Sequence, residues 1–496
     1  MEKIILSERR LRDQVRGCWL GKNIGGTLGA PYEGRRHVQA LEFYEPVPEK
    51  PAANDDLDLQ FLWLKLLEDA GLDPPLPLFA EYWTRYAAAY PWNEYGFAHR
   101  NLSRGLAPPI SGCFENYFVD EMGSPIRSEI WACVCAGDPQ RAAALAWKDS
   151  ALDHAGGEGT WGEMFWAAVE AAAFVESDPE TLIAIGLSMI PISSHISRAI
   201  REALWCWKSK LPWGEARERI ASRFGHLQPC NAVPNHGFII IGWLYGKSFG
   251  DRLCKAVNCG YDTDCTGATL GSLLGILAGY DAIPAEWKRP VGEQITLHPF
   301  TGDCSAPKDL SELTDRTMAL AARMAAERSA TVAISGDPGL RDHRLPAGAR
   351  TMLFRNELAL RARSRDPQSA YAMDEGGSGI EVVLHYGGDP VMRPGVGRLL
   401  RATFERGGEE LRADEVVLRA PAGWLVEKES ADSFLVTAEA PADRERLVVE
   451  ARVEGRSVRA SFGILGPGEA KGFPAGANVE YCKNCGGRAG FCVCRR

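Results

Sequence analysis

The chain has 496 residues, a formal net charge of −9 and a hydrophobic content of 45%. This length is too great for a single hydrophobic core, so we expect two or three domains. The negative charge argues against a nucleic-acid partner. Because no run of 18 apolar residues occurs, no membrane partner is expected either. The charged N-terminus lacks a signal-peptide core, which indicates a cytoplasmic protein, while composition leaves the oligomeric state open.

Residues 1–328 have the pattern of an all-α domain. Apolar residues recur at three- and four-residue steps, for example between Trp161 and Ala172. Another predicted helix follows Asn54, which is a good N-cap residue. A third carries glycines at four-residue spacing from Gly267 to Gly279. Because glycine is a poor helix former, we expect a second helix to approach the backbone of this one closely.

The composition changes after Arg328, where glycine and proline become frequent. We expect a linker over residues 329–345. Over residues 346–470, short alternating segments predict a β-sandwich accessory domain. The clearest of them are 449–453 and 458–464, whose spacing is typical of a hairpin.

A cysteine-rich tail over residues 478–496 has a separate pattern. It contains Cys482, Cys485, Cys492 and Cys494. Four thiols at this spacing favour a structural Zn²⁺ in a small knuckle. Disulfides are the alternative, and they would need an oxidising compartment. The other cysteines are scattered irregularly, as is typical of reduced thiols.

Two acidic clusters, each at the start of a predicted helix, carry the strongest chemical signal. The first is Asn54-Asp55-Asp56, and the second runs from Asp262 to Thr266. Gathered carboxylates repel one another and lose hydration, so a fold that joins the clusters needs a cation between them. Oxygen ligands of this kind favour Mg²⁺, Ca²⁺ or Mn²⁺, and two clusters can hold two ions. Asp58, taken alone, is better explained as a helix-capping charge.

Several ordered motifs between residues 10 and 285 resemble those of the ADP-ribosylglycohydrolase family. The segment from Gly17 to Gly34 resembles the opening of these proteins, and the two acidic clusters match their Thr/Ser-Asp-Asp and Asp-x-Asp-Thr/Ser motifs. Segments 123–128 and 149–154 resemble further landmarks. The resemblance implies an all-α fold, a two-ion magnesium site that holds ribose, and hydrolysis of an N- or O-glycosidic bond. The implied substrate is a small molecule or an ADP-ribosylated one.

The resemblance also implies roles for individual residues. Catalysis falls to Glu33 and Asp56, and substrate binding to Arg127, Asp149 and His154. Arg127 has an alternative role as the partner of a carboxylate, and His154 has one as a structural loop residue. The implied metal ligands are Asn54, Asp55, Asp56, Asp262, Asp264, Cys265 and Thr266.

This chain departs from the family at two of the metal positions. Asn54 replaces Thr or Ser, and Cys265 replaces a ligating Thr or Ser, with Thr266 next to it. Because a thiol is a poor ligand for Mg²⁺, Cys265 opens the choice to a softer ion such as Mn²⁺. The sequence therefore predicts a metal-dependent glycohydrolase. The alternatives are a non-catalytic, crystallin-like binding protein on the same fold and a two-metal phosphohydrolase.

Overall fold

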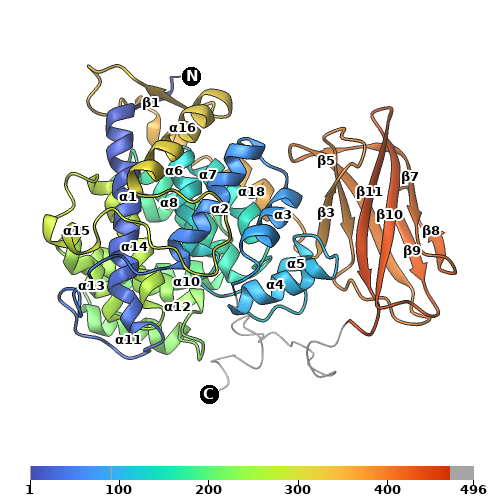
Figure 1. Ribbon diagram of the computed structural model, residues 1–496, viewed down its shortest axis with the longest axis horizontal. Coiled ribbons are helices and arrows are strands. Elements are labelled where there is room, and N and C mark those ends of the chain that lie inside the picture. The colour runs from blue at the N-terminus through green and yellow to red at the C-terminus, as the bar shows by residue number, and fades with distance from the viewer. Residues whose placement is uncertain (1, 91, 470–496) are drawn as a thin grey trace.

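The computed structural model describes residues 2–90 and 92–469, in which a helical part is joined to a β part (Figure 1). The helical part contains the α-helices α1 (Glu8–Gly29), α2 (Asp55–Ala70), α3 (Leu76–Tyr86), α4 (Asn93–Ser103), α5 (Ile110–Cys113), α6 (Ser128–Val134), α7 (Pro139–Ser150), α8 (Glu158–Ala173), α9 (Pro179–Met189), α10 (His195–Lys208), α11 (Trp213–Phe224), α12 (Ala232–Tyr245), α13 (Phe249–Asn258), α14 (Thr263–Ala278), α15 (Ala285–Val291), α16 (Leu310–Glu327), α17 (Ala349–Leu353) and α18 (Glu357–Arg363). Two 3₁₀ turns, η1 (Ala30–Tyr32) and η2 (Pro125–Arg127), lie among them. The all-α class expected for this part is confirmed.

The centre of the helical part is a close antiparallel pair formed by α1 and α14, which run side by side in Figure 1. A Cβ added to Gly21 would lie 2.0 Å from the carbonyl oxygen of Gly271, and one added to Gly25 would lie 1.8 Å from that of Gly267. These distances leave no room for any side chain. The glycine stripe predicted to accept a second helix does so, and its partner helix carries a matching stripe.

Two short strands close the helical part at its N-terminal end. Strand β1 (Ile4–Ser7) pairs in parallel with β2 (Val332–Ser335). The segment 329–345, predicted to be a linker, therefore contains a strand. Ile4 and Val332 are buried in the helical core, which explains why this segment is fixed.

The β part contains two facing sheets, as the predicted sandwich requires. One has the order β11-β10-β7 and the other the order β3-β4-β5-β9-β8, with β6 pairing to β5. The strands are β3 (Ser369–Met373), β4 (Glu381–His385), β5 (Arg398–Arg406), β6 (Glu409–Leu411), β7 (Ala413–Arg419), β8 (Leu425–Lys428), β9 (Ser433–Thr437), β10 (Arg444–Val453) and β11 (Arg456–Leu465). Alternate apolar side chains of both sheets form one buried core, to which Leu106 and Ile110 of the helical part also belong.

The start of the β part differs from the expected boundary at residue 346. Helices α17 and α18 follow that residue, and the first strand of the two sheets begins at Ser369. Ala359 of α18 is fully buried in the helical core. The composition change at Arg328 does not reveal these helices, because they are short and rich in arginine and alanine.

Two further predictions concern the cysteine-rich tail and the absence of a membrane span. The zinc knuckle expected at Cys482, Cys485, Cys492 and Cys494 lies outside the described residues. Within residues 2–90 and 92–469, no helix is long and apolar enough to cross a lipid bilayer.

Candidate active site

The α1–α14 pair brings the predicted acidic clusters to one end of the helical part. Gly29, at the end of α1, packs against the backbone of Thr263 at the start of α14, where an added Cβ would lie 2.0 Å from the Thr263 carbonyl oxygen. The first turn of α14 carries Asp264 and Cys265, and Glu33 follows closely after α1. Helix α2 contributes Asp56 from its own first turn. The segments 33, 54–56 and 262–266 thus meet although they are far apart in sequence.

Two groups of ligand atoms result from this convergence. In the first, Asp56, Asp264 and Cys265 place one donor atom each within 4.8 Å of the others. Glu33, Cys230 and Asp262 form the second group under the same limit. The sulfur of Cys265 is 3.8 Å from Oδ2 of Asp56, which links the two predicted clusters directly. Each group has the size of a single-ion site.

Hydrogen bonds do not fully compensate the buried carboxylates of this site. The Oδ1 atoms of Asp56, Asp262 and Asp264 are buried and have no hydrogen-bond donor among the described residues. Burial raises the pKa of all three carboxyl groups well above the usual range, and neighbouring carboxylates raise it further. A buried, unpaired carboxylate is costly unless it is protonated or binds a cation. The donor set therefore fits a divalent ion bound mainly by oxygen.

A buried lysine supplies only part of the missing positive charge. Lys22 of α1 is 1% exposed, and its Nζ lies 2.8 Å from Glu129 and 3.8 Å from Asp56. Although burial lowers the pKa of Lys22, the two carboxylates raise it more, so this side chain stays charged. Its hydrogen bond goes to Glu129, which also accepts one from Gln60. Lys22 thus balances Glu129 and leaves the aspartates in need of a cation.

Not every residue in the predicted clusters points into the site. Asn54 caps α2, because its Oδ1 accepts a hydrogen bond from the Asp56 backbone at 2.8 Å. The Thr266 hydroxyl donates to the Thr263 carbonyl at 3.2 Å and is directed at its own helix. At the position where the family has a ligating Thr or Ser, the structure places Cys265 beside the aspartates, and Thr266 does not take its place. Asp55 lies next to these groups, with its Oδ2 3.5 Å from the Tyr95 hydroxyl.

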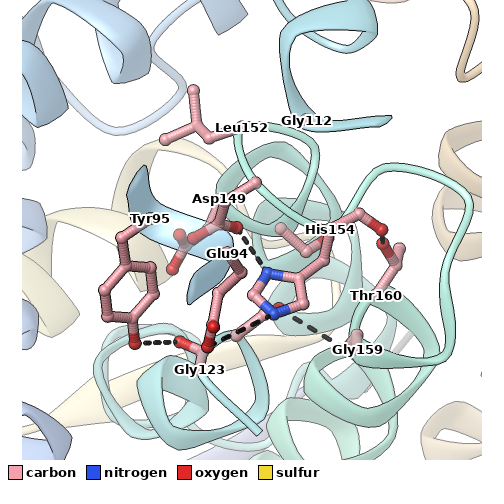
Figure 2. Close-up of polar contacts among 12 residues, drawn as sticks. Glu94, Tyr95, Gly112, Gly123, Asp149, Leu152, His154, Gly159 and Thr160 are labelled. Atoms are coloured by element: carbon pink, nitrogen blue, oxygen red, sulfur yellow. Dashed lines mark hydrogen bonds and ion pairs between the residues drawn. The ribbon is translucent and has the colours of Figure 1, made fainter. Parts of the chain in front are cut away.

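The predicted substrate-binding residues form a buried network. Arg127 and Asp149 are fully buried, and their side chains pair at 2.8 Å. Arg127 also pairs with Asp153 at 2.8 Å. This arrangement favours the alternative reading of Arg127 as the partner of carboxylates, with Asp149 as one of them. His154 is fully buried as well, but one edge of its ring faces Glu94 (Figure 2).

Sequence reasoning missed several polar residues around this site, among them Lys22, Cys230, Glu94 and Glu121. Lys22 had a usable signal, since it interrupts an otherwise small and apolar helix face. Cys230, Glu94 and Glu121 had none, because they lie singly in segments with no motif. Glu121 is 3% exposed, its Oε2 has no hydrogen-bond partner among the described residues, and burial raises its pKa well above the usual range.

Comparison with known proteins agrees with this geometry. The family model described as ADP-ribosylglycohydrolase matches residues 7–329, which include the glycine-paired helices and both acidic clusters. This chain belongs to the ADP-ribosylglycohydrolase family. Membership of the family supports glycohydrolase activity in general.

Other comparisons add less. A solved structure titled "ADP-ribosylglycohydrolase-related protein complex" has 20% sequence identity and a TM-score of 0.41, and the match covers 63% of this chain and 98% of that chain. The comparison with curated proteins found no match. The family match stops close to the end of α16, so it leaves α17, α18 and the β part without a counterpart.

Proposed function

We propose that this ADP-ribosylglycohydrolase is a metal-dependent hydrolase that cleaves an N- or O-glycosidic bond of an ADP-ribosyl or related ribosyl substrate. The observation that carries the proposal is the convergence of α2 and α14 on buried aspartate oxygens that lack hydrogen-bond donors. In a purely structural cluster these oxygens would accept hydrogen bonds, as those of Glu129 do from Lys22 and Gln60.

The residues that would hold divalent ions follow from the two groups of donors. Asp56, Asp264 and Cys265 would hold one ion, and Glu33, Asp262 and Cys230 would surround the other. Mg²⁺ fits the oxygen donors, and Mn²⁺ fits the added thiols better. When bound, such ions supply a grip on neighbouring ribose hydroxyls and lower the pKa of bound water.

Glu33 has the features of a general base for the attacking water. Glu33 follows η1 in a surface loop, but its carboxyl group lies beside Asp262 and is largely surrounded by protein atoms. Burial and the Asp55 charge raise the pKa of Glu33, which suits a group that must take up a proton. Departure of the leaving group from the anomeric carbon would pass through an oxocarbenium-like state, which the surrounding carboxylates stabilise electrostatically.

Product analysis tests the proposal. Metal-free protein would be given Mg²⁺ or Mn²⁺ together with ADP-ribosyl-arginine, O-acetyl-ADP-ribose, ADP-ribose 1″-phosphate, or simple nucleosides. Release of ADP-ribose or free ribose, dependent on the ion, is the expected result. Release of inorganic phosphate without sugar release would favour a two-metal phosphohydrolase. If no substrate is turned over, the non-catalytic reading is favoured.

The Asp56→Asn substitution links any activity to the site. It should lower kcat/KM by more than about 100-fold, because loss of even an indirect metal contact typically costs 10–100-fold. Asp69→Asn is a matched control on the same helix, where Asp69 forms an exposed pair with Lys65. Activity in Asp56→Asn equal to that of the control would contradict the assignment of the site.

A further inference from the structure

Glu94 and His154 form a buried pair beside the aspartate cluster. Glu94 lies in the first turn of α4 and is 6% exposed, whereas His154 is fully buried. Oε1 of Glu94 is 3.9 Å from Nε2 of His154, and Figure 2 shows the two side chains facing each other. This nitrogen has no hydrogen bond within the described residues. Its edge of the ring is thus directed at the Glu94 carboxyl group.

The other edge of the His154 ring is fixed. Nδ1 lies 2.7 Å from Oδ1 of Asp153, which Arg127 grips through two hydrogen bonds of 2.8 and 3.0 Å. Although burial raises the pKa of Asp153, Arg127 and His154 lower it more, so Asp153 is ionised. Because a carboxylate only accepts hydrogen bonds, Nδ1 must carry a hydrogen. The remaining ring nitrogen, Nε2, then faces the Glu94 carboxyl group.

Two glycines provide the space that this pair occupies. A Cβ on Gly123 would lie 2.1 Å from Oε1 of Glu94, and one on Gly159 would lie 2.3 Å from Cδ2 of His154. Any other residue at either position would displace one member of the pair. The backbone of this region is thus shaped around the Glu94–His154 contact.

Tyr95 connects the pair to the predicted metal ligands. Its hydroxyl donates to the Gly123 carbonyl at 2.9 Å and is 3.5 Å from Oδ2 of Asp55. The same point beside Gly123 that lies 2.1 Å from Glu94 Oε1 lies 2.7 Å from the Tyr95 hydroxyl. The carboxyl group of Glu94 and the phenol of Tyr95 are therefore neighbours. Glu94 keeps 6% of its surface exposed and His154 keeps none, so Glu94 is the member of the pair that a ligand can reach.

We propose that Glu94 donates the proton to the leaving group, and that His154 is the positioning residue that holds it. This proposal rests on the proposed glycohydrolase function. As the bond from the anomeric carbon to the leaving nitrogen or oxygen breaks, its electron pair stays on that atom, which takes the proton of Glu94. Water adds to the anomeric carbon and gives its proton to Glu33. Exchange with solvent then restores Glu94 as the acid and Glu33 as the base.

The charges around Glu94 are compatible with this role. Burial raises the pKa of Glu94 to about 7. The charge of His154 lowers this pKa, and the charges of Asp153 and Asp55 raise it. Glu121 is a further carboxyl group that interacts with Glu94. A carboxylic acid with a pKa in this range is still partly protonated at neutral pH, as a proton donor must be.

A comparison of leaving groups tests the role in catalysis. For Glu94→Gln, kcat/KM should fall by about 10²- to 10⁴-fold with a poor leaving group, the usual contribution of general acid catalysis. With 4-nitrophenol, which leaves without protonation, the loss should be less than about tenfold. Glu158→Gln is the matched control, since Glu158 also has a pKa of about 7 but accepts hydrogen bonds from the backbone of α10. Equal losses with both leaving groups would overturn the proposal.

His154→Asn separates positioning from a merely structural effect. Because His154 lowers the pKa of Glu94, its removal should shift the alkaline limb of the pH–rate profile to higher pH. Infrared difference spectra of wild type against Glu94→Gln give a readout that needs no substrate. A carboxyl band that titrates between about pH 6 and pH 8 is expected, where an active-site acid is usually tuned.

The two readouts keep the proposals apart. If no substrate is hydrolysed while the band titrates, the glycohydrolase function fails but the proton-holding pair stands. If the band is absent, Glu94 is not the acid even when hydrolysis occurs. Circular dichroism of each variant shows whether a loss comes from unfolding, and Glu94→Asp, which keeps the acid, should recover part of the activity.

Discussion

At the scale of single residues, the role of each side chain in the site depends on whether it already has a structural hydrogen-bond partner. Asn54 and Asp58 lie on either side of Asp55 and Asp56, yet both make ordinary structural bonds. Asn54 caps α2, and Asp58 accepts hydrogen bonds from the His298 backbone and the Thr301 hydroxyl. Oδ1 of Asp58 has no hydrogen-bond partner among the described residues, but of these four residues only Asp56 belongs to a group of ligand atoms close enough to share a cation.

The cysteine beside the aspartates should set the metal preference. Replacing Cys265 by Thr exchanges a soft donor for a hard one, so the affinity for Mg²⁺ should rise relative to that for Mn²⁺ or Cd²⁺. Isothermal titration of the metal-free protein with each ion would measure the ratio. Cys259→Ser serves as the control, because the Cys259 thiol follows α13 (Phe249–Asn258) and donates to the Lys255 carbonyl of that helix. An unchanged ratio would show that the Cys265 sulfur is not a ligand.

The convergence of the two acidic segments could be predicted from sequence, because each precedes an apolar helix and each matches a motif of the resembled family. Their partners could not. Nothing near Glu94 or Cys230 in the sequence indicates that the fold places either residue beside segments 54–56 and 262–266. The roles of Asn54 and Thr266 also depend on rotamers, since an Asn or a Thr at a helix start can turn its oxygen toward either the helix or a ligand.

At the scale of elements, the α1–α14 pair is what aligns the site. Its glycines allow main-chain contact along most of α14 and the C-terminal part of α1, from Gly17 against Gly275 to Gly29 against Thr263. This contact fixes the register of the two helices, and so fixes where Glu33 lies relative to Asp262. The four-residue spacing of the glycines predicts the stripe on α14, but spacing alone does not identify the helix that faces it.

Enlarging one glycine of this contact should destabilise the protein severely. In Gly21→Ala the new Cβ would lie 2.0 Å from a backbone oxygen, so the free energy of unfolding should fall by about 3 kcal/mol or more, at the upper end of overpacking costs. Gly214→Ala is the matched control in a helix with open space around it, where a gain of about 0.5 kcal/mol is expected. Chemical denaturation measures both. A loss below about 1 kcal/mol in Gly21→Ala would show that the helices separate easily.

At the scale of the whole molecule, the helical and β parts meet at an interface. Backbone atoms of the two parts contact each other there, and residues of the helical part are buried in the core of the β part. The segment after α4 sends Leu106 and Ile110 into the core of the sandwich. Pro109 forms a bridge with Ala370, and Gly105 meets Gly463 of β11. Sequence patterns distinguish the two parts well, but they do not show this exchange, because an isolated leucine looks the same in either core.

Separating the two parts should be possible with one substitution. A Cβ on Gly463 would lie 2.2 Å from the Gly105 carbonyl oxygen, so Gly463→Val should open the interface while both cores persist. We expect faster proteolysis between residues 364 and 369 and two unfolding transitions in calorimetry. Ser457→Ala, at an exposed position of the same strand, is the control. A single transition at the wild-type temperature would contradict this account of the interface.

The glycine contact between α1 and α14 also limits how the protein can change. In most packed interfaces, a larger residue on one side can be offset by a smaller one opposite. Here the atom in the way is a main-chain carbonyl oxygen, which every amino acid carries. No substitution at the facing position can therefore rescue a side chain introduced at Gly21 or Gly25. A selection for suppressors of Gly21→Ala should yield changes elsewhere in the chain, or only true reversion.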